Sequence, residues 1–202
     1  MSTAPNVQHS AVTADWGTPR AVVELARSVL GGIDLDPASS GYFNHHVVRA
    51  AAIYDEHSDG LANPWRGRLL VNPPGTLAGQ RAAFERGSVP RKFWERLIGH
   101  YIAGDVDAAV WVGFSLEQLV LLQGSPMHPL QFLTLFPCER LAFLQRGPGN
   151  GPPIEGGSPT HGNFITLLPS RRDRDVAAQQ VRTFLSLAQQ LTGVAGAIVR
   201  PT

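Results

Sequence analysis

The sequence predicts an α/β protein with a mostly parallel β-sheet, helices on both faces of that sheet and an antiparallel hairpin at one edge. Short apolar segments alternate with segments whose apolar residues recur at helical spacing, which is typical of open α/β folds. The last short strands follow one another closely, and this favours the antiparallel hairpin. A length of 202 residues with 43% hydrophobic residues suits one domain, which we expect at 15–202 after a flexible polar arm at 1–14.

The first predicted elements are short and clearly bounded. A helix is expected over 19–30, with Thr18 as its cap, Pro19 at its first position and a Gly-Gly pair after its end. The strand at 33–36 ends in an acidic residue, and the segment at 44–54 then has a helical pattern. This part of the chain therefore predicts a strand that carries a carboxylate at its carboxyl end.

The middle of the chain predicts two buried strands and two helices. The apolar strand at 68–71 stops at an Asn-Pro-Pro-Gly sequence. A polar stretch at 76–90 has no clear period, and loops of this length are usually functional or mobile. Residues 91–103 predict a helix with aromatic residues along one side, 108–112 predict a buried strand, and 115–122 predict a short helix that begins at a serine cap.

The last part of the chain predicts three short strands and a terminal helix. The strands are expected at 131–135, 141–144 and 164–168, with a Gly/Pro-rich loop at 145–159, and the amphipathic helix at 173–191. In open α/β sheets, ligands bind outside the carboxyl ends of the strands. Two of the motifs described below follow strands, so they become candidates for a single site.

Composition and charge restrict the compartment and the partners. The formal net charge of +1 excludes a global basic field, so nucleic acid would need a local patch built from arginines, since Lys92 is the one lysine. The single Cys138 excludes an internal disulfide and a multi-cysteine zinc site. His45, His46 and His57 lack metal-ligand spacing, so no metal is expected.

No apolar run approaches the roughly 20 residues of a membrane span, and we expect a cytoplasmic protein that does not bind membranes. The oligomeric state stays open.

The most specific feature is the sequence Asn72-Pro73-Pro74-Gly75. Two consecutive prolines fix the backbone and cannot donate hydrogen bonds, so the Asn72 side-chain oxygen and the Pro73 carbonyl are presented as two fixed acceptors. Two converging acceptors can hold both hydrogens of an exocyclic amine and orient its lone pair towards an electrophile. The alternative is a proline turn that ends the strand and has no chemistry.

Several motifs that lie in order in the first 75 residues point to one family. They are Asp15-Trp16-Gly17-Thr18-Pro19, Asp34-Leu35-Asp36-Pro37-Ala38-Ser39-Ser40, Asn44, Asp59-Gly60-Leu61 with Trp65, and Val71-Asn72-Pro73-Pro74. This set resembles the phage-type, Dam-like DNA N6-adenine methyltransferases. The resemblance implies a single-domain, Rossmann-like enzyme that binds S-adenosylmethionine and transfers its methyl group to adenine N6 in DNA. It also suggests a phage or mobile-element setting.

The resemblance implies two groups of roles. Asn72 and Pro73 would hold the amine, and Pro74 would stiffen the turn. The implied cofactor-binding residues are Trp16, Thr18, Pro19, Asp34, Asp36, Pro37, Ser39, Asn44 and Asp59. The first three of these would flank the methionine end of the cofactor, and the last would contact its adenine amine. Because side chains alternate along a strand, at most one of Asp34 and Asp36 faces the cleft, and we prefer Asp36.

One departure from the family concerns the target base. The family's tetrapeptide usually ends in an aromatic residue on which the flipped base stacks, and this chain has Gly75. Such stacking is worth roughly 1 to 3 kcal/mol per base. Phe84, Phe93 or Trp94 could supply the platform. Otherwise the target is a different amine, in RNA, protein or a small molecule, or the chain is an altered or inactive DNA-binding protein with a methyltransferase fold.

A DNA-binding surface would have to be assembled from loops. The expected substrate-binding residues are Gly75, Arg81, Arg86, Arg91, Lys92, Phe93, Trp94 and His161. A second group of basic residues comprises Arg140, Arg146, Arg171, Arg172 and Arg174. Phosphate contacts from such residues fix register without reading sequence. An adenine in a duplex must be extruded to be methylated, and the loop at 75–90 is the segment we expect to move.

Overall fold

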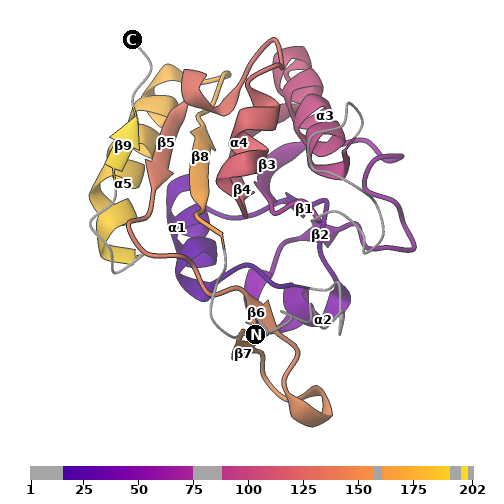
Figure 1. Cartoon of the computed structure of the whole chain (residues 1–202). Coiled ribbons are helices and arrows are strands. Elements are labelled where there is room, and N and C mark those ends of the chain that lie inside the picture. The colour runs from indigo at the N-terminus through magenta and orange to yellow at the C-terminus, as the bar shows by residue number, and fades with distance from the viewer. Residues whose placement is uncertain (1–15, 75–87, 157–160, 192–196, 200–202) are drawn as a thin grey trace, which may run out of the picture.

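A seven-stranded sheet with the strand order β2-β1-β3-β4-β8-β5-β9 forms the centre of the molecule (Figure 1). The computed structural model describes residues 16–74, 88–156, 161–191 and 197–199. The strands are β1 (Leu35–Asp36), β2 (Ala52–Ile53), β3 (Gly67–Val71), β4 (Val106–Gly113), β5 (Leu133–Phe136), β8 (Phe164–Leu168) and β9 (Ala197–Val199). The pairings give β1 to β5 one direction, with β8 and β9 opposed to them. The predicted mixed α/β architecture is therefore confirmed.

Helices cover both faces of this sheet, as the sequence predicts (Figure 1). Helices α1 (Arg20–Leu30) and α5 (Arg174–Leu191) pack on one face, whereas α3 (Val89–Ala103) and α4 (Leu116–Leu122) pack on the other. Side chains of a strand alternate between the two faces. On β4, for example, Val110 belongs to the first core and Trp111 to the second. The sheet is thus buried on both sides.

The helix predicted over 44–54 is wrong. The chain instead forms a short helix α2 (Gly41–Phe43), a π-helical turn over Asn44–Val48, and then strand β2. Arg49 adopts a left-handed conformation at φ 51°, which ends the turn. The Asn44 side chain accepts from the Ala50 amide at 2.8 Å and donates to the Ala50 carbonyl at 3.3 Å. This local pairing closes the turn and competes with a continuing helix.

The antiparallel strands do not form the predicted edge hairpin. Strand β8 lies inside the sheet, between β4 and β5, and β9 forms the edge. Buried Thr134 and Thr166 face each other across β5 and β8, with their hydroxyls 2.9 Å apart. The segment predicted as a strand over 141–144 leaves the sheet, and a separate ribbon pairs β6 (Leu144–Gln145) with β7 (Ile154–Glu155).

The order of the parallel strands reverses beside β1. From β1 the chain runs to β2 on one side and then returns to β3 on the other side. The crevice outside the carboxyl ends of strands at such a switch point is the usual ligand site of open α/β sheets. Asp36 ends β1, and Asn72 directly follows β3. The two motifs singled out in the sequence therefore meet at the switch point.

Asn163 joins three segments next to this edge of the sheet. Its side chain donates to the Phe114 carbonyl and accepts from the Leu141 amide, each at 2.8 Å, and the residue is buried. It thereby connects the end of β4 with the start of β8 and with the segment that leads into the ribbon.

None of the helices in the described part of the chain combines the length and apolar character that a membrane span requires.

Replacing Asn163 by alanine should lower the free energy of unfolding by about 2 to 4 kcal/mol, because a buried amide and a buried carbonyl both lose their partner. Urea denaturation measures this change. The exposed Gln123→Ala on the outer end of α4 is the matched control, with an expected change within about 0.5 kcal/mol. Equal effects of the two substitutions would contradict the structural role of Asn163.

Candidate functional site

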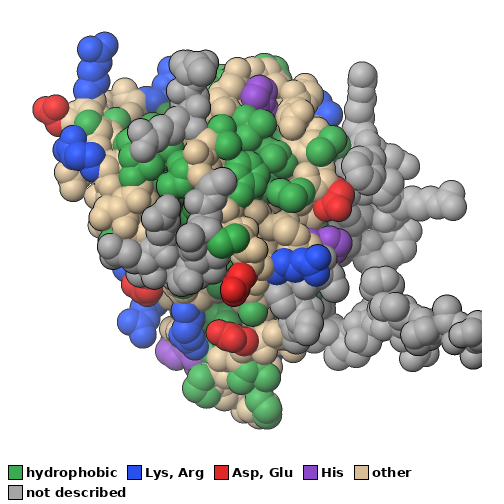
Figure 2. Space-filling model, turned by 60° about the vertical axis from the view of Figure 1, so that its left-hand side comes forward, with side chains coloured by type: hydrophobic (Ala, Val, Ile, Leu, Met, Phe, Trp, Pro, Cys, Tyr) green, Lys and Arg blue, Asp and Glu red, His purple; other side chains and the backbone are tan. Residues whose placement is uncertain are grey.

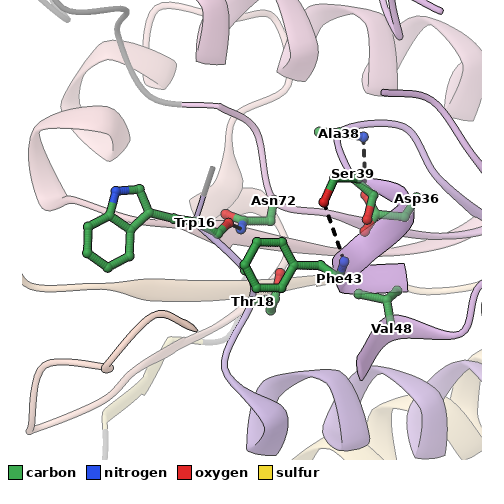
Figure 3. Close-up of a pocket in the computed structure, with 10 residues that line it drawn as sticks. Trp16, Thr18, Asp36, Ala38, Ser39, Phe43, Val48 and Asn72 are labelled. Carbon is green, nitrogen blue, oxygen red and sulfur yellow. Dashed lines mark hydrogen bonds between the residues drawn. The ribbon is translucent and has the colours of Figure 1, made fainter. Parts of the chain in front are cut away.

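A small pocket lies at the carboxyl ends of β1 and β3 (Figure 3). Its lining consists of Trp16, Gly17, Thr18, Asp36, Ala38, Ser39, Ser40, Phe43, Val48 and Asn72. Its cavity volume of about 10 Å³ is close to the room that one water molecule needs. The lining side chains therefore nearly fill the pocket in this structure, and a ligand would have to open it further.

The segment before α1 forms one wall of the pocket. Gly17 pairs with Leu144 of β6 through two backbone hydrogen bonds of 2.9 and 2.8 Å, so it extends the β6–β7 ribbon. A Cβ atom on Gly17 would lie 2.3 Å from the Phe43 ring, and this close packing requires glycine. Thr18 is buried, but it does not cap α1, because Pro19 is the cap residue and the helix begins at Arg20. The predicted Thr18 cap is therefore wrong.

Asp36 is the one titratable side chain among the described residues that line the pocket. It is 2% exposed, and burial raises its pKa from 3.8 to about 7, although the Ala38 amide and the Ser39 hydroxyl hydrogen-bond to it. None of the ion pairs given for the described residues involves Asp36. A buried carboxylate without a cation is costly, and it favours a ligand that brings a positive charge or hydroxyl donors.

The turn after β1 holds this carboxylate in place. The Asp36 Oδ1 accepts from the Ala38 amide at 3.1 Å, and the Ser40 hydroxyl accepts from the Phe43 amide at 3.4 Å, which caps α2 (Figure 3). Pro37 is buried behind the turn, where its carbonyl would lie 2.0 Å from a Cβ on Gly60. The Asp-Gly-Leu motif thus packs directly against the Asp36–Pro37 turn.

Asp59 lies next to this turn, but its carboxylate serves its own loop. The residue is left-handed at φ 47°, and its Oδ1 accepts from the Leu61 amide at 2.9 Å. The carboxylate does not line the pocket. Asp59 therefore shapes the loop that backs the site, and its contact with a cofactor adenine stays a prediction.

Two further predicted cofactor residues lie away from the pocket. Asp34 precedes β1, at the amino end of the strand, where its carboxylate accepts from the Arg68 guanidinium at 2.7 and 2.9 Å and from the Arg68 amide at 2.8 Å. These bonds hold the pKa of Asp34 below its usual range. The Asn44 side chain is hydrogen-bonded to the backbone of Ala50, as described above. The sequence-based preference for Asp36 over Asp34 agrees with these positions.

Of the Asn72-Pro73-Pro74 sequence, Asn72 reaches the pocket. Asn72 is half-buried and lines the pocket, and its Nδ2 donates to the Trp16 carbonyl at a long 3.5 Å. Pro73 is buried and Pro74 is exposed. The predicted substrate-binding residues Gly75, Arg81 and Arg86, and Phe84 with them, lie outside the described residues.

The other predicted substrate-binding residues belong to different surroundings. Phe93 and Trp94 are buried in the core under α3, and the Trp94 Nε1 donates to the Met127 carbonyl at 2.7 Å. Their burial does not fit a stacking platform. Arg91 pairs with Glu95 on the same helix, and Lys92 is exposed there. His161 is exposed and lies 3.9 Å from Glu117, at the start of α4.

The second arginine group divides between two ends of the sheet. Arg171 donates to the Tyr101 carbonyl, and Arg172 donates to the Gly104 carbonyl, where α3 ends before β4. This is the edge opposite to the pocket. Arg146 instead stacks over the Tyr42 ring beside the β6–β7 ribbon. Figure 2 shows the Lys and Arg side chains of one face scattered around a central hydrophobic area rather than gathered together.

Sequence reasoning missed the residues that shape the pocket by packing. Phe43 and Val48 line it from α2 and the π-helical turn, and Gly156 receives the Trp16 ring. Apolar residues in a short helix and a glycine in a Gly/Pro-rich loop carry no distinctive signal in a single sequence. In the described part of the chain, no cluster of three or more His, Cys, Asp or Glu side chains could hold a metal ion.

No family model, curated protein or solved structure gives a significant match to this chain. The site is therefore defined by its own geometry: a buried carboxylate and a proline-fixed asparagine on two walls of one pocket, at the switch point of an α/β sheet.

The burial of Asp36 predicts a stability that depends on pH. Its folded pKa of about 7 exceeds the unfolded value of 3.8, so ionisation destabilises the fold progressively as pH rises from about 4 to 7. Asp36→Asn removes this cost. Because one pKa unit corresponds to about 1.4 kcal/mol, the variant should gain roughly 2 to 3 kcal/mol over wild type between pH 5 and pH 8. Urea denaturation at both pH values tests this, and a pH-independent difference would contradict it.

Proposed function

We propose that this protein is an S-adenosylmethionine-dependent methyltransferase that acts on the N6 amine of adenine in DNA. The observation that carries the proposal is the meeting of Asp36 and Asn72 in one pocket at the switch point of the sheet. A ligand site there is expected from the fold. The motif resemblance described above supplies the chemical identity of the ligand and of the reaction.

The polar groups of the pocket lining suit the methionine end of S-adenosylmethionine. The buried Asp36 carboxylate is a partner for the ammonium group or for ribose hydroxyls, and the small pocket would open further as the cofactor binds. Thr18 and Ser39 add hydroxyls to the same lining. Gly17 brings the backbone of the Trp-Gly-Thr segment close to the pocket, because it leaves room for the Phe43 ring.

The Asn72 side of the pocket would provide the acceptors for the amine. The Asn72 oxygen and the Pro73 carbonyl would hold the two amine hydrogens, so that the nitrogen lone pair faces the methyl group. When bound, S-adenosylmethionine supplies an electrophilic methyl group: the C–N bond forms as the C–S bond breaks, and the amine then loses a proton to water. The prolines limit the reorganisation of these acceptors, which favours catalysis by positioning and electrostatics.

A methyltransferase for a different amine is the second candidate. One observation favours it: Arg171 and Arg172 contact the edge of the sheet opposite to the pocket, and Arg91 is paired with Glu95. These three arginines thus contribute little to a phosphate-binding surface at the site. The identity of the acceptor, DNA, RNA or another amine, is decided by the transfer assay described below.

Calorimetry with S-adenosylmethionine tests the cofactor. We expect binding that is roughly eightfold weaker near pH 6 than near pH 7.5, because the carboxylate form of Asp36, with a pKa of about 7, is needed to pair with the ammonium. Asp36→Asn should weaken binding and abolish its pH dependence. Glu24→Gln, an exposed carboxylate on α1, is the matched control. Absence of binding by the wild-type protein would exclude the proposed function.

Transfer of a labelled methyl group to DNA, with RNA in parallel, tests the reaction. Asn72→Ala should reduce transfer by at least about 100-fold, because one preorganised hydrogen-bonding group at the reacting amine is lost. Transfer is measured at saturating S-adenosylmethionine, because Asn72 also lines the pocket proposed for the cofactor. Gln179→Ala on the exposed side of α5 serves as the control. Full activity of the Asn72 variant would show that the amine is held elsewhere.

A further inference from the structure

We infer that Trp16 is the stacking platform for the target base, the role that Gly75 cannot fill. This inference rests on the proposed function and assigns a substrate contact within it. The chain contains four tryptophans. Trp65, Trp94 and Trp111 are fully buried, whereas Trp16 is 45% exposed. An exposed indole at the rim of a functional pocket is the group on which a base can stack.

The backbone of Trp16 is fixed at the rim of the pocket. The next residue, Gly17, pairs with Leu144 in both directions, so the segment is held as an added strand of the ribbon. The Trp16 carbonyl accepts from the Asn72 Nδ2. The side chain that would hold the amine and the residue that carries the indole are therefore direct neighbours.

The indole ring of Trp16 packs closely against Gly156. A Cβ atom on Gly156 would lie 2.4 Å from the Trp16 Cζ3, so the absence of a side chain there admits the six-membered ring. The Gly156 amide donates to the Phe143 carbonyl at 2.7 Å, and this bond holds Gly156 at the end of the ribbon. A ring that is held in this way loses little conformational entropy when a base stacks on it.

The orientation of the indole separates it from the cofactor pocket. In Figure 3 the ring points away from Asp36, on the Asn72 side of the pocket. The backbone of Trp16 can thus flank the methionine end of the cofactor while the ring serves another partner. A base has an aromatic face for the indole and an exocyclic amine for Asn72. One adenine can therefore meet both groups, whereas a purely phosphate contact would use neither.

Tryptophan fluorescence tests this inference directly, because emission that acrylamide can quench comes from Trp16 alone. The protein is saturated with S-adenosylhomocysteine and titrated with dodecadeoxyadenylate or with an abasic strand of equal length and charge. We expect the adenylate to change and protect the Trp16 emission, and the abasic strand to leave it unchanged. Equal responses to the two strands would overturn the inference. A full response to S-adenosylmethionine alone would also overturn it, because the ring would then hold the cofactor's adenine.

Variants separate this inference from the proposed function. Trp16→Ala should weaken binding of dodecadeoxyadenylate by about 5- to 150-fold, the range that corresponds to one stacked base, and Trp16→Phe should retain most of the affinity. Ile154→Ala, an exposed apolar residue on β7, is the matched control. Ile154→Ala should leave the affinities for the oligonucleotide and for S-adenosylmethionine unchanged. If Trp16→Ala weakened S-adenosylmethionine binding as much as oligonucleotide binding, the ring would hold the cofactor, and the inference would be overturned. Unchanged oligonucleotide binding by Trp16→Ala, with cofactor binding intact, would refute the platform and leave the methyltransferase proposal standing.

Discussion

The arrangement of the site depends on the reversal of strand order at β1. Because the chain runs from β1 to β2 on one side and returns to β3 on the other, the ends of β1 and β3 are neighbours at the carboxyl edge of the sheet. The polar groups that follow these strands are therefore brought together although 36 residues separate Asp36 from Asn72. The segment before α1 forms another wall of the pocket. The backbone pairing of Gly17 with Leu144 holds this segment against the β6–β7 ribbon.

Burial then gives the polar groups their properties. Asp36 is buried at the end of β1, and its carboxylate accepts hydrogen bonds from Ala38 and Ser39 of its own turn. Asp34, two residues earlier, has the opposite environment, because Arg68 neutralises it and three bonds satisfy it. One carboxylate thus stabilises the start of two strands, and the other is left without a cation in a pocket. This contrast is the physical reason for treating Asp36 as a ligand-binding group.

The sequence predicts this site in part because some of its determinants are local. Apolar runs ending in Asp36 and Asn72 mark two strand ends, and the proline pair after Asn72 predicts fixed acceptors without knowledge of the fold. The packing of Phe43 on Gly17 and of Trp16 on Gly156 could not be predicted, since it joins segments that are remote in sequence. The position of β8 between β4 and β5 was missed for the same reason, because strand neighbours in a mixed sheet depend on pairing over long separations. At 44–54, the Asn44 side chain overrides a helical pattern by binding Ala50.

The central claim is that the Asp36 carboxylate receives the positively charged end of the cofactor. Carbon-13 NMR of the aspartate carboxyl groups, titrated from pH 4 to pH 9 with and without S-adenosylhomocysteine, measures this contact at the atom concerned, and Asp36→Asn assigns the signal. We expect a pKa of about 7 for Asp36 in the free protein and a fall of more than one unit when the ligand is bound. If saturating ligand left this pKa unchanged, Asp36 would not be the group that receives the charged end of the cofactor.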